Sequence, residues 1–279
     1  MADRKVAVRD GMFLTEVHEE GNGPPLLFLH GVRGVPTDAP FLARLAQQYR
    51  VIAPVLPGYG ESTGTEHLRD LHDLIYYELD LLDTLGLRHV PLVGHSLGGM
   101  VAAELAVVQP DRFSALVLIA PFGLWNPAYP VADFFAMSPE QLAAATYHDP
   151  QSPAAQAAAH TPADQEGYIA FMLDRAKALA TAAKYLWPIP NRGLAGRLHR
   201  VSAPTLLVWG ESDRIVPPRY AQDFQAKIAT AQVTIIPAAG HLPHLEQPER
   251  TAETVLRFLA AQDVGGERRP ATGVPAGRG

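Results

Sequence analysis

Ser96 stands at the centre of the spacing Gly94-x-Ser96-x-Gly98, where a short apolar run gives way to a helical pattern. A sharp strand-to-helix turn forces its central residue toward positive φ, which a side chain bearing a Cβ adopts at a cost of about 1–3 kcal/mol. Flanking glycines let neighbouring backbone pass close to such a turn. The pattern therefore predicts a serine hydroxyl lifted clear of a sheet as a nucleophile.

A serine hydroxyl needs a nearby base and a third group that orients this base. Candidates follow two later strand-like runs: Asp213 in "LLVWGESDRIVPP" and His241 in "TIIPAAGHLPHLEQPE". Because the carboxyl ends of parallel strands meet at one edge of a sheet, we expect Ser96, Asp213 and His241 to converge there. Three neighbours remain as alternatives, two as the acid and one as the base: Glu211, Asp223 and His244.

The elements that must position these residues alternate between β-like and helical patterns. Strands are expected at 5–8, 12–18, 26–30, 50–54, 89–95, 114–121, 205–210 and 233–237. Helices are expected at about 40–48, 68–85, 97–108, 218–228 and 248–262. This alternation indicates a mainly parallel sheet covered by helices on both faces, with the first two strands forming an antiparallel hairpin.

The segment between the sixth and seventh strands has a different character. It is rich in Ala, Pro and aromatic residues and shows helical periods without a convincing strand. We therefore expect a core in two parts, 1–121 and 201–264, with a helical cap (lid) at 122–200 inserted between them. Residues 265–279 have the Gly, Pro and Arg composition of a disordered tail.

Composition limits the classes of protein to which this sequence can belong. The 279 residues carry a formal net charge of -6 and are 47% hydrophobic, which fits a sizeable domain and no nucleic acid partner. There is no cysteine, so neither a disulfide framework nor thiolate chemistry is expected. The absence of a secretion signal and of a long apolar run predicts no membrane partner and a cytoplasmic location.

Four motifs together carry a resemblance: "LHGVRG", "GHSLGG", "GESDRIVP" and "GHLPHLEQPE". Over residues 10–262 the sequence resembles the serine hydrolases of the α/β-hydrolase fold superfamily that have a helical cap, a group that includes esterases and meta-cleavage-product hydrolases. The resemblance implies an α/β fold with a mostly parallel eight-stranded sheet. It also favours Asp213 as the acid, in the family's G-x-x-D position, and His241 as the base, since the family's base directly follows a glycine.

The resemblance also implies an oxyanion hole, the pair of N–H groups that receives the negative charge of the tetrahedral intermediate. Carried over by position, its donors would be the backbone N–H groups of Val32, in His30-Gly31-Val32, and of Leu97, the residue after the nucleophile. Loss of one such donor costs about 3 kcal/mol in transition-state stabilisation. The charge is met by fixed dipoles, so neither a cofactor nor a metal is expected.

Residues that would contact the substrate are harder to select. We expect Phe122, Trp125 and Trp187 of the cap to face it. Arg192 follows the cap where carbon-carbon hydrolases of the family carry a substrate-binding arginine. Leu242, which is also placed at the substrate, stands directly after His241, where those enzymes usually have tryptophan.

The sequence therefore predicts a serine hydrolase that acts through an acyl-enzyme on a small to medium hydrophobic ester, thioester or lactone. The expected partner is this small-molecule substrate, and a homodimer is possible. One alternative is a carbon-carbon bond hydrolase of the meta-cleavage-product type. Others are a cofactor-free lyase or peroxidase-type enzyme and a ligand-binding receptor on the same fold.

Overall fold

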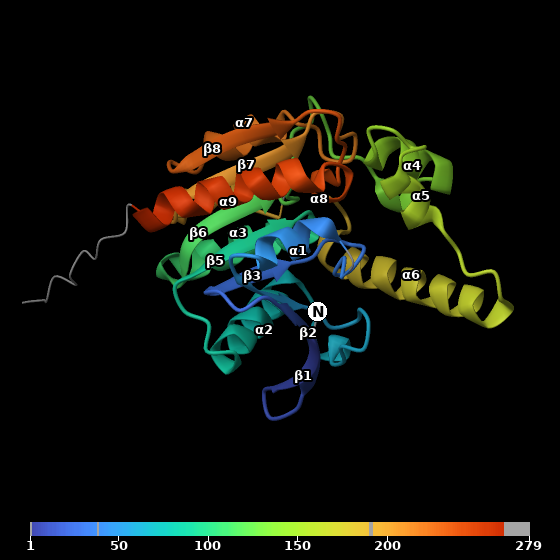
Figure 1. The fold of residues 1–279 in the computed structure, drawn as a ribbon, viewed down its shortest axis with the longest axis horizontal. Helices are drawn as coiled ribbons and strands as arrows, with labels where there is room; N and C mark the ends of the chain where they lie inside the picture. Colours follow the sequence, from blue (N-terminus) through green and yellow to red (C-terminus); the bar gives the residue numbers. More distant parts are fainter. Residues whose placement is uncertain (1, 38, 190–191, 265–279) are drawn as a thin grey trace, which may run out of the picture.

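A single sheet runs through the molecule, and helices cover both of its faces (Figure 1). The structure is a computed structural model that describes residues 2–37, 39–189 and 192–264. The predicted tail at 265–279 lies outside the described residues. The strands are β1 Ala2–Val8, β2 Phe13–Glu20, β3 Pro25–Leu29, β4 Arg50–Pro54, β5 Val90–His95, β6 Phe113–Ile119, β7 Thr205–Gly210 and β8 Ala231–Ile236.

The helices follow the strands in an alternating order. They are α1 Pro40–Ala46, α2 Leu71–Thr84, α3 Leu97–Val108, α4 Pro139–Thr146, α5 Pro153–Ala159, α6 Gln165–Leu186, α7 Tyr220–Gln225, α8 Pro243–Glu246 and α9 Pro248–Val264. Short 3₁₀ helices lie at Thr65–His67, Pro110–Arg112, Phe134–Ala136, Leu194–Gly196 and Leu198–Arg200.

The eight strands lie in the order β1-β2-β4-β3-β5-β6-β7-β8. Only β2 runs against its neighbours: it pairs antiparallel with both β1 and β4, and every other pair is parallel. The prediction of a mostly parallel eight-stranded sheet with an antiparallel hairpin is confirmed. Because β5, β7 and β8 are parallel, the loops that follow them lie at one edge of the sheet.

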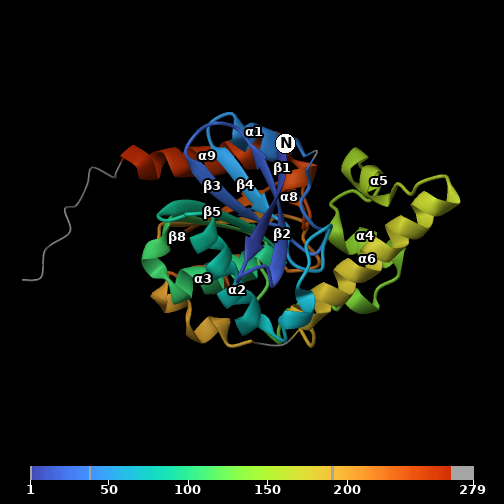
Figure 2. The same ribbon diagram turned by 90° about the horizontal axis from the view of Figure 1, so that it is seen from below.

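Side chains of successive strand residues point to opposite faces of the sheet. In β3, Leu26 and Phe28 pack into the core beneath α1 and α9, whereas Leu27 and Leu29 pack into the core beneath α2, α3 and α7. Figure 2 shows α1 and α9 on one side of the sheet and α2 and α3 on the other. Each fully buried apolar side chain of this size contributes about 1.5–3 kcal/mol, so both layers stabilise the sheet.

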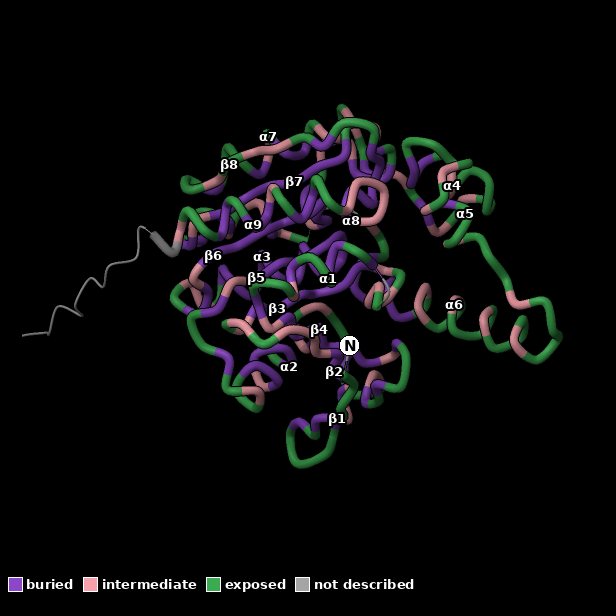
Figure 3. The backbone as a smooth tube through the Cα atoms, in the orientation of Figure 1, coloured by how far each residue is buried: buried purple, intermediate pink, exposed green. Residues whose placement is uncertain are grey.

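The described residues between β6 and β7 form helices and no strand. Helices α4, α5 and α6 project from one side of the molecule (Figures 1 and 2). The 22-residue helix α6 begins at its cap Asp164, whose side chain accepts the N–H of Gly167 at 2.7 Å. Only its C-terminal end, from Thr181 onward, is buried, and the rest is largely exposed (Figure 3).

Some helices begin or end at other residues than predicted, because side-chain caps and turns set their ends. Helix α2 begins at Leu71 rather than 68, because the Asp70 side chain accepts the N–H groups of His72 and Asp73. Helix α7 is shorter than the predicted 218–228, since the chain at each end forms turns: the N–H of Tyr220 donates to Pro217, and that of Lys227 donates to Phe224. Helix α8 had no counterpart in the prediction.

A carboxyl group without a hydrogen-bond partner in the described part of the chain lies inside the core. Glu78 is on the buried face of α2, and among the described residues neither of its carboxyl oxygens has a hydrogen-bond partner. Burial without a compensating bond disfavours the charged form and raises the pKa of Glu78 to about 8. The folded protein therefore holds a proton there that the unfolded chain releases near the ordinary pKa of 4.5.

Glu78 should make the protein less stable as the pH rises. The pKa of Glu78 is higher in the folded state than in the unfolded state. The stabilisation that its bound proton contributes is therefore complete below the pKa of the unfolded state and is lost as the pH rises through the pKa of the folded state. We expect wild type to lose about 3 kcal/mol of unfolding free energy, relative to Glu78→Gln, from about pH 5 to about pH 8. Urea unfolding at each pH measures this difference, and Glu253→Gln on the exposed face of α9 is the control. Parallel pH curves for wild type and Glu78→Gln would contradict the assignment.

Candidate active site

Ser96 is the turn residue between β5 and α3. Its backbone has φ 56° and ψ −116°, the positive φ that the glycine spacing predicted. The turn is held on both sides, because the N–H of Ser96 donates to Ile119 at 2.9 Å and its carbonyl accepts the N–H of Phe122 at 3.1 Å. The surrounding sheet therefore fixes a conformation that a non-glycine residue adopts only under strain.

The two motif glycines permit the close approach of α3 to the sheet. A Cβ on Gly98 would lie 2.2 Å from the carbonyl oxygen of Leu29 and 2.5 Å from that of His30. A Cβ on Gly94 would lie 2.4 Å from the carbonyl oxygen of Gly98. These neighbours are backbone atoms and cannot rotate away, so the glycines are needed for packing rather than for chemistry.

The substitution Gly98→Ala should move α3 away from β3 and displace Ser96. We expect a loss of about 2–3 kcal/mol in unfolding free energy, near the upper end for overpacked sites. Thermal and urea unfolding measure it, and Gly196→Ala is the matched control because a Cβ there meets no atom within 4 Å. Equal stabilities for the two variants would show that α3 can move without cost.

The three residues predicted to converge do meet. Nε2 of His241 lies 3.0 Å from Oγ of Ser96, and Nδ1 of His241 lies 2.8 Å from Oδ2 of Asp213. The other carboxylate oxygen of Asp213 accepts the N–H groups of Ile215 and Val216, each at 2.9 Å. The Asp213 side chain is fully buried and that of His241 is 8% exposed. The carboxylate is thus fixed, and it orients the imidazole toward the hydroxyl.

The alternative acids and base lie elsewhere. The Glu211 side chain accepts the N–H of Ala238, and Asp223 accepts the hydroxyl of Tyr129 at 2.7 Å. His244 is buried against the rings of Phe28, Phe41 and His95, and burial lowers its pKa to about 3. Geometry therefore favours Asp213 and His241 over these neighbours.

Two further histidines lie near the site, and the hydrogen bonds of their rings go to backbone groups and not to Ser96. His30 donates from Nδ1 to the carbonyl of Gly31 at 2.7 Å and accepts the N–H of Leu56 at 3.0 Å, and burial lowers its pKa to about 4. His95 donates from Nε2 to the carbonyl of His241 at 3.0 Å, and burial holds its pKa well below its ordinary value. Both rings are therefore neutral structural groups.

The two candidate oxyanion donors stand beside Ser96. Leu97 is the first residue of α3, so its N–H has no carbonyl to donate to within the helix. Val32 lines the same cavity as Ser96 and follows Gly31, where a Cβ would lie 3.1 Å from Cβ of Ser96. The loop after β3 is therefore in contact with the turn that carries the hydroxyl.

A cavity of about 390 Å³ opens over Ser96 and His241. Much of its wall is apolar, from the core and from the inserted helices: Val32, Val35, Phe122, Phe134, Leu142, Phe171, Ala178, Leu179, Ile215 and Leu242. Phe122 and Leu242 were predicted to lie there. The Phe122 ring centroid is 5.8 Å from that of His241, so this side chain lies next to the imidazole.

Trp125, Trp187 and Arg192, all within the described part of the chain, are not among the residues that line this cavity. Trp125 is 38% exposed and Trp187 is 51% exposed. The Arg192 guanidinium donates to the carbonyl of Trp187 and so closes the end of α6. The expectation that these three side chains face the substrate is not met in this cavity, because each lies on the outer surface.

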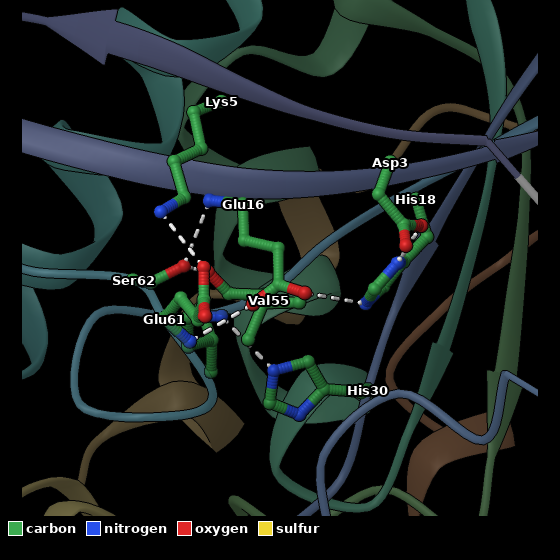
Figure 4. A network of polar contacts seen from close by, with 9 residues as sticks. Asp3, Lys5, Glu16, His18, His30, Val55, Glu61 and Ser62 are labelled. Atoms are coloured by element: carbon green, nitrogen blue, oxygen red, sulfur yellow. Dashed lines mark hydrogen bonds and ion pairs between the residues drawn. The ribbon is translucent and has the colours of Figure 1, made fainter.

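The cavity also has a polar end that no sequence motif indicated. Glu16 and His18 of β2 line it, and His18 lies between two carboxylates: Nε2 is 3.3 Å from Glu16 and Nδ1 is 2.6 Å from Asp3 (Figure 4). The other oxygen of Glu16 accepts the N–H of Glu61 at 2.9 Å. Glu16 and His18 lie in the hairpin and belong to none of the four motifs, so no spacing indicated them.

Among residues 2–37, 39–189 and 192–264, no cluster of three or more His, Asp or Glu side chains could hold a metal ion. In the same part of the chain, no helix has the length and apolar character needed to cross a membrane.

Comparison with known proteins places the chain in a family. The model of the alpha/beta hydrolase family matches residues 26–254, so this chain belongs to that family and is a hydrolase-class enzyme. It is 28% identical to 2-hydroxymuconate semialdehyde hydrolase of Pseudomonas sp. (strain CF600), over 89% of this chain and 91% of that protein. The fold matches the crystal structure of a bacterial membrane phospholipase A with a TM-score of 0.77 and 25% identity, over 94% of this chain and 86% of the other.

A third relative is longer than this chain. The dihydrolipoyllysine-residue acetyltransferase component of the acetoin cleaving system of Pseudomonas putida is 32% identical over 255 residues. The match covers 88% of this chain and 65% of that protein, so the chain spans less than two thirds of the relative's length. These three relatives are named for different reactions, so the similarities do not define a substrate for this chain.

Proposed function

We propose that this chain is a serine hydrolase that cleaves a small to medium hydrophobic ester, thioester or lactone through an acyl-enzyme. The observation that carries the proposal is the hydrogen-bonded series Ser96, His241 and Asp213, of which Ser96 and His241 line a mainly apolar cavity. Such a series can activate a hydroxyl that is otherwise a poor nucleophile at neutral pH.

The first half of the reaction forms the acyl-enzyme. The Ser96 hydroxyl donates its proton to Nε2 of His241 as Oγ attacks the carbonyl carbon, and Asp213 holds the ring with its proton on Nδ1. The N–H groups of Val32 and Leu97 would receive the oxyanion. His241 then gives its proton to the leaving oxygen or sulfur as the tetrahedral intermediate collapses.

The second half releases the acid. Water gives a proton to His241 and attacks the acyl carbon, and the Ser96 oxygen leaves and recovers its proton from the imidazolium. The cavity of about 390 Å³ lies within the range of small-ligand sites, and its apolar walls favour a hydrophobic acyl or alcohol group over a sugar or a peptide.

Carbon-carbon bond cleavage is the second candidate. The similarity to 2-hydroxymuconate semialdehyde hydrolase along nearly the whole of both chains favours it. Against it stand Leu242 directly after His241 and the position of Arg192 outside the cavity. A vinylogous diketone that is cleaved faster than p-nitrophenyl esters would decide for this candidate.

The test of the proposal combines labelling with turnover. We expect a fluorophosphonate probe to label the chain once, at Ser96, as peptide mass spectrometry identifies, and short p-nitrophenyl esters to be hydrolysed continuously. Prior labelling should abolish the hydrolysis. A chain that retains the ester or its analogue tightly without turnover would instead be a receptor, and a chain that is never labelled would not use Ser96 as a nucleophile.

A further inference from the structure

Helix α4 ends against the loops that follow β7 and β8. The carbonyl oxygen of Thr146, its last residue, accepts the N–H of His241 at 2.6 Å. The carbonyl of Ala145 accepts the N–H of Arg214 at 3.1 Å, and the Arg214 guanidinium donates to Ala144 at 2.7 Å. The last carbonyl groups of a helix have no partner within it, so the two loops supply the cap of α4.

Glu246, at the end of α8, joins the same two parts of the molecule. Its Oε1 accepts the N–H of Gly240 at 2.8 Å, and its Oε2 accepts the N–H of His148 at 2.7 Å. Gly240 directly precedes His241, and His148 follows α4 by two residues. One carboxylate therefore connects the backbone beside the imidazole to the inserted helices.

The contact at Gly240 leaves no space between the two chain segments. A Cβ on Gly240 would lie 2.2 Å from the carbonyl oxygen of Thr146 and 2.9 Å from the backbone nitrogen of His148. An ionised carboxylate can accept two N–H groups at once, one on each oxygen. An amide in its place has one acceptor and one donor, so one of the two N–H groups would face another donor.

We infer that Glu246 is a positioning residue for His241, holding Gly240 against His148 so that the imidazole stays within hydrogen-bond distance of Ser96. The inference rests on the proposed function, since it assigns to Glu246 an effect on the base of that reaction. Glu246 acts through the backbone and does not touch the substrate. Misplacement of a catalytic group by about 1 Å can lower the rate about 100-fold, so the loss of one bond has a measurable effect.

The substitution Glu246→Gln tests this role. We expect kcat for a p-nitrophenyl ester, expressed per fluorophosphonate-titrated site, to fall about 10- to 100-fold, with KM within about twofold of wild type. Glu249→Gln in the exposed first turn of α9 makes the same chemical change three residues away and should leave both constants unchanged.

Two outcomes would overturn the inference. The first is a Glu246→Gln variant whose kcat per labelled site equals that of wild type. A merely structural role would lower the number of folded, labelled sites but not the rate at each of them. If Glu246→Gln does not fold, a measurement on wild type tests the inference instead. The amide hydrogens of Gly240 and His148 should exchange slowly with solvent, and exchange as fast as in an unbonded loop would overturn the inference. If wild-type Ser96 is not labelled, the proposed function fails independently of Glu246.

Discussion

Ser96→Ala should reduce ester hydrolysis by about 10⁶-fold, the loss typical when the nucleophile of a serine hydrolase is removed. In the proposed mechanism no acyl-enzyme can then form, while the proposed oxyanion donors, the N–H groups of Val32 and Leu97, and the apolar cavity stay in place. The fold should be unchanged, because alanine keeps the Cβ that already occupies the strained φ of 56°. Initial rates with a p-nitrophenyl ester and a fluorophosphonate labelling assay measure the loss.

The control for this prediction is Ser202→Ala. Ser202 is exposed, and its hydroxyl lies 3.4 Å from the carbonyl of Pro110, far from the cavity. This variant should be labelled and active like wild type. If Ser96→Ala kept a substantial share of the activity, or still took up the probe, the nucleophile would be another residue.

Asp213→Asn should lower kcat by about 10⁴-fold with little change in KM. The asparagine oxygen can still accept the N–H groups of Ile215 and Val216 in place of Oδ1. Its amide N–H₂ group then faces Nδ1 of His241, so Nδ1 must accept a hydrogen bond. The imidazole ring must then carry its proton on Nε2. The ring then cannot take a proton from Ser96, and so the geometry survives while the base is lost. Steady-state kinetics with a p-nitrophenyl ester measure the two constants.

Asp223→Asn provides the matched control, since Asp223 was an alternative acid in the sequence analysis. Its carboxylate binds the hydroxyl of Tyr129 and not His241, so its replacement should leave kcat within about twofold of wild type. A large fall in kcat for Asp223→Asn, together with a small one for Asp213→Asn, would exchange the roles of the two acids.

The sequence allowed the turn at Ser96, and the positions of Asp213 and His241, to be predicted because the local constraints on these residues are strong. Between β5 and α3 the hydrophobic period changes within one residue of Ser96, and backbone approach restricts positions 94 and 98 to glycine. Asp213 and His241 each follow a buried strand, and parallel strands end at a common edge. Local patterns and the rules of sheet topology were therefore sufficient to bring the three side chains together.

The rest of the site depends on contacts that sequence spacing does not encode. An aromatic residue in a helical segment has the same local pattern whether it faces a cavity or solvent, so the pattern could not show that Phe122 lines the cavity while Trp125 and Trp187 are exposed. Glu16 and His18 reach the cavity only because β2 pairs antiparallel with β4. Their position follows from tertiary pairing and not from local preference.

The separation of the reacting groups along the polypeptide has a consequence for biogenesis. Ser96 and His241 are 145 positions apart, and the strands between them must pair before the hydroxyl meets the imidazole. A ribosome-bound chain that has emerged only as far as α6 contains Ser96 but not yet His241. Any chemistry that needs both groups therefore becomes possible only late in synthesis, after these long-range contacts have formed.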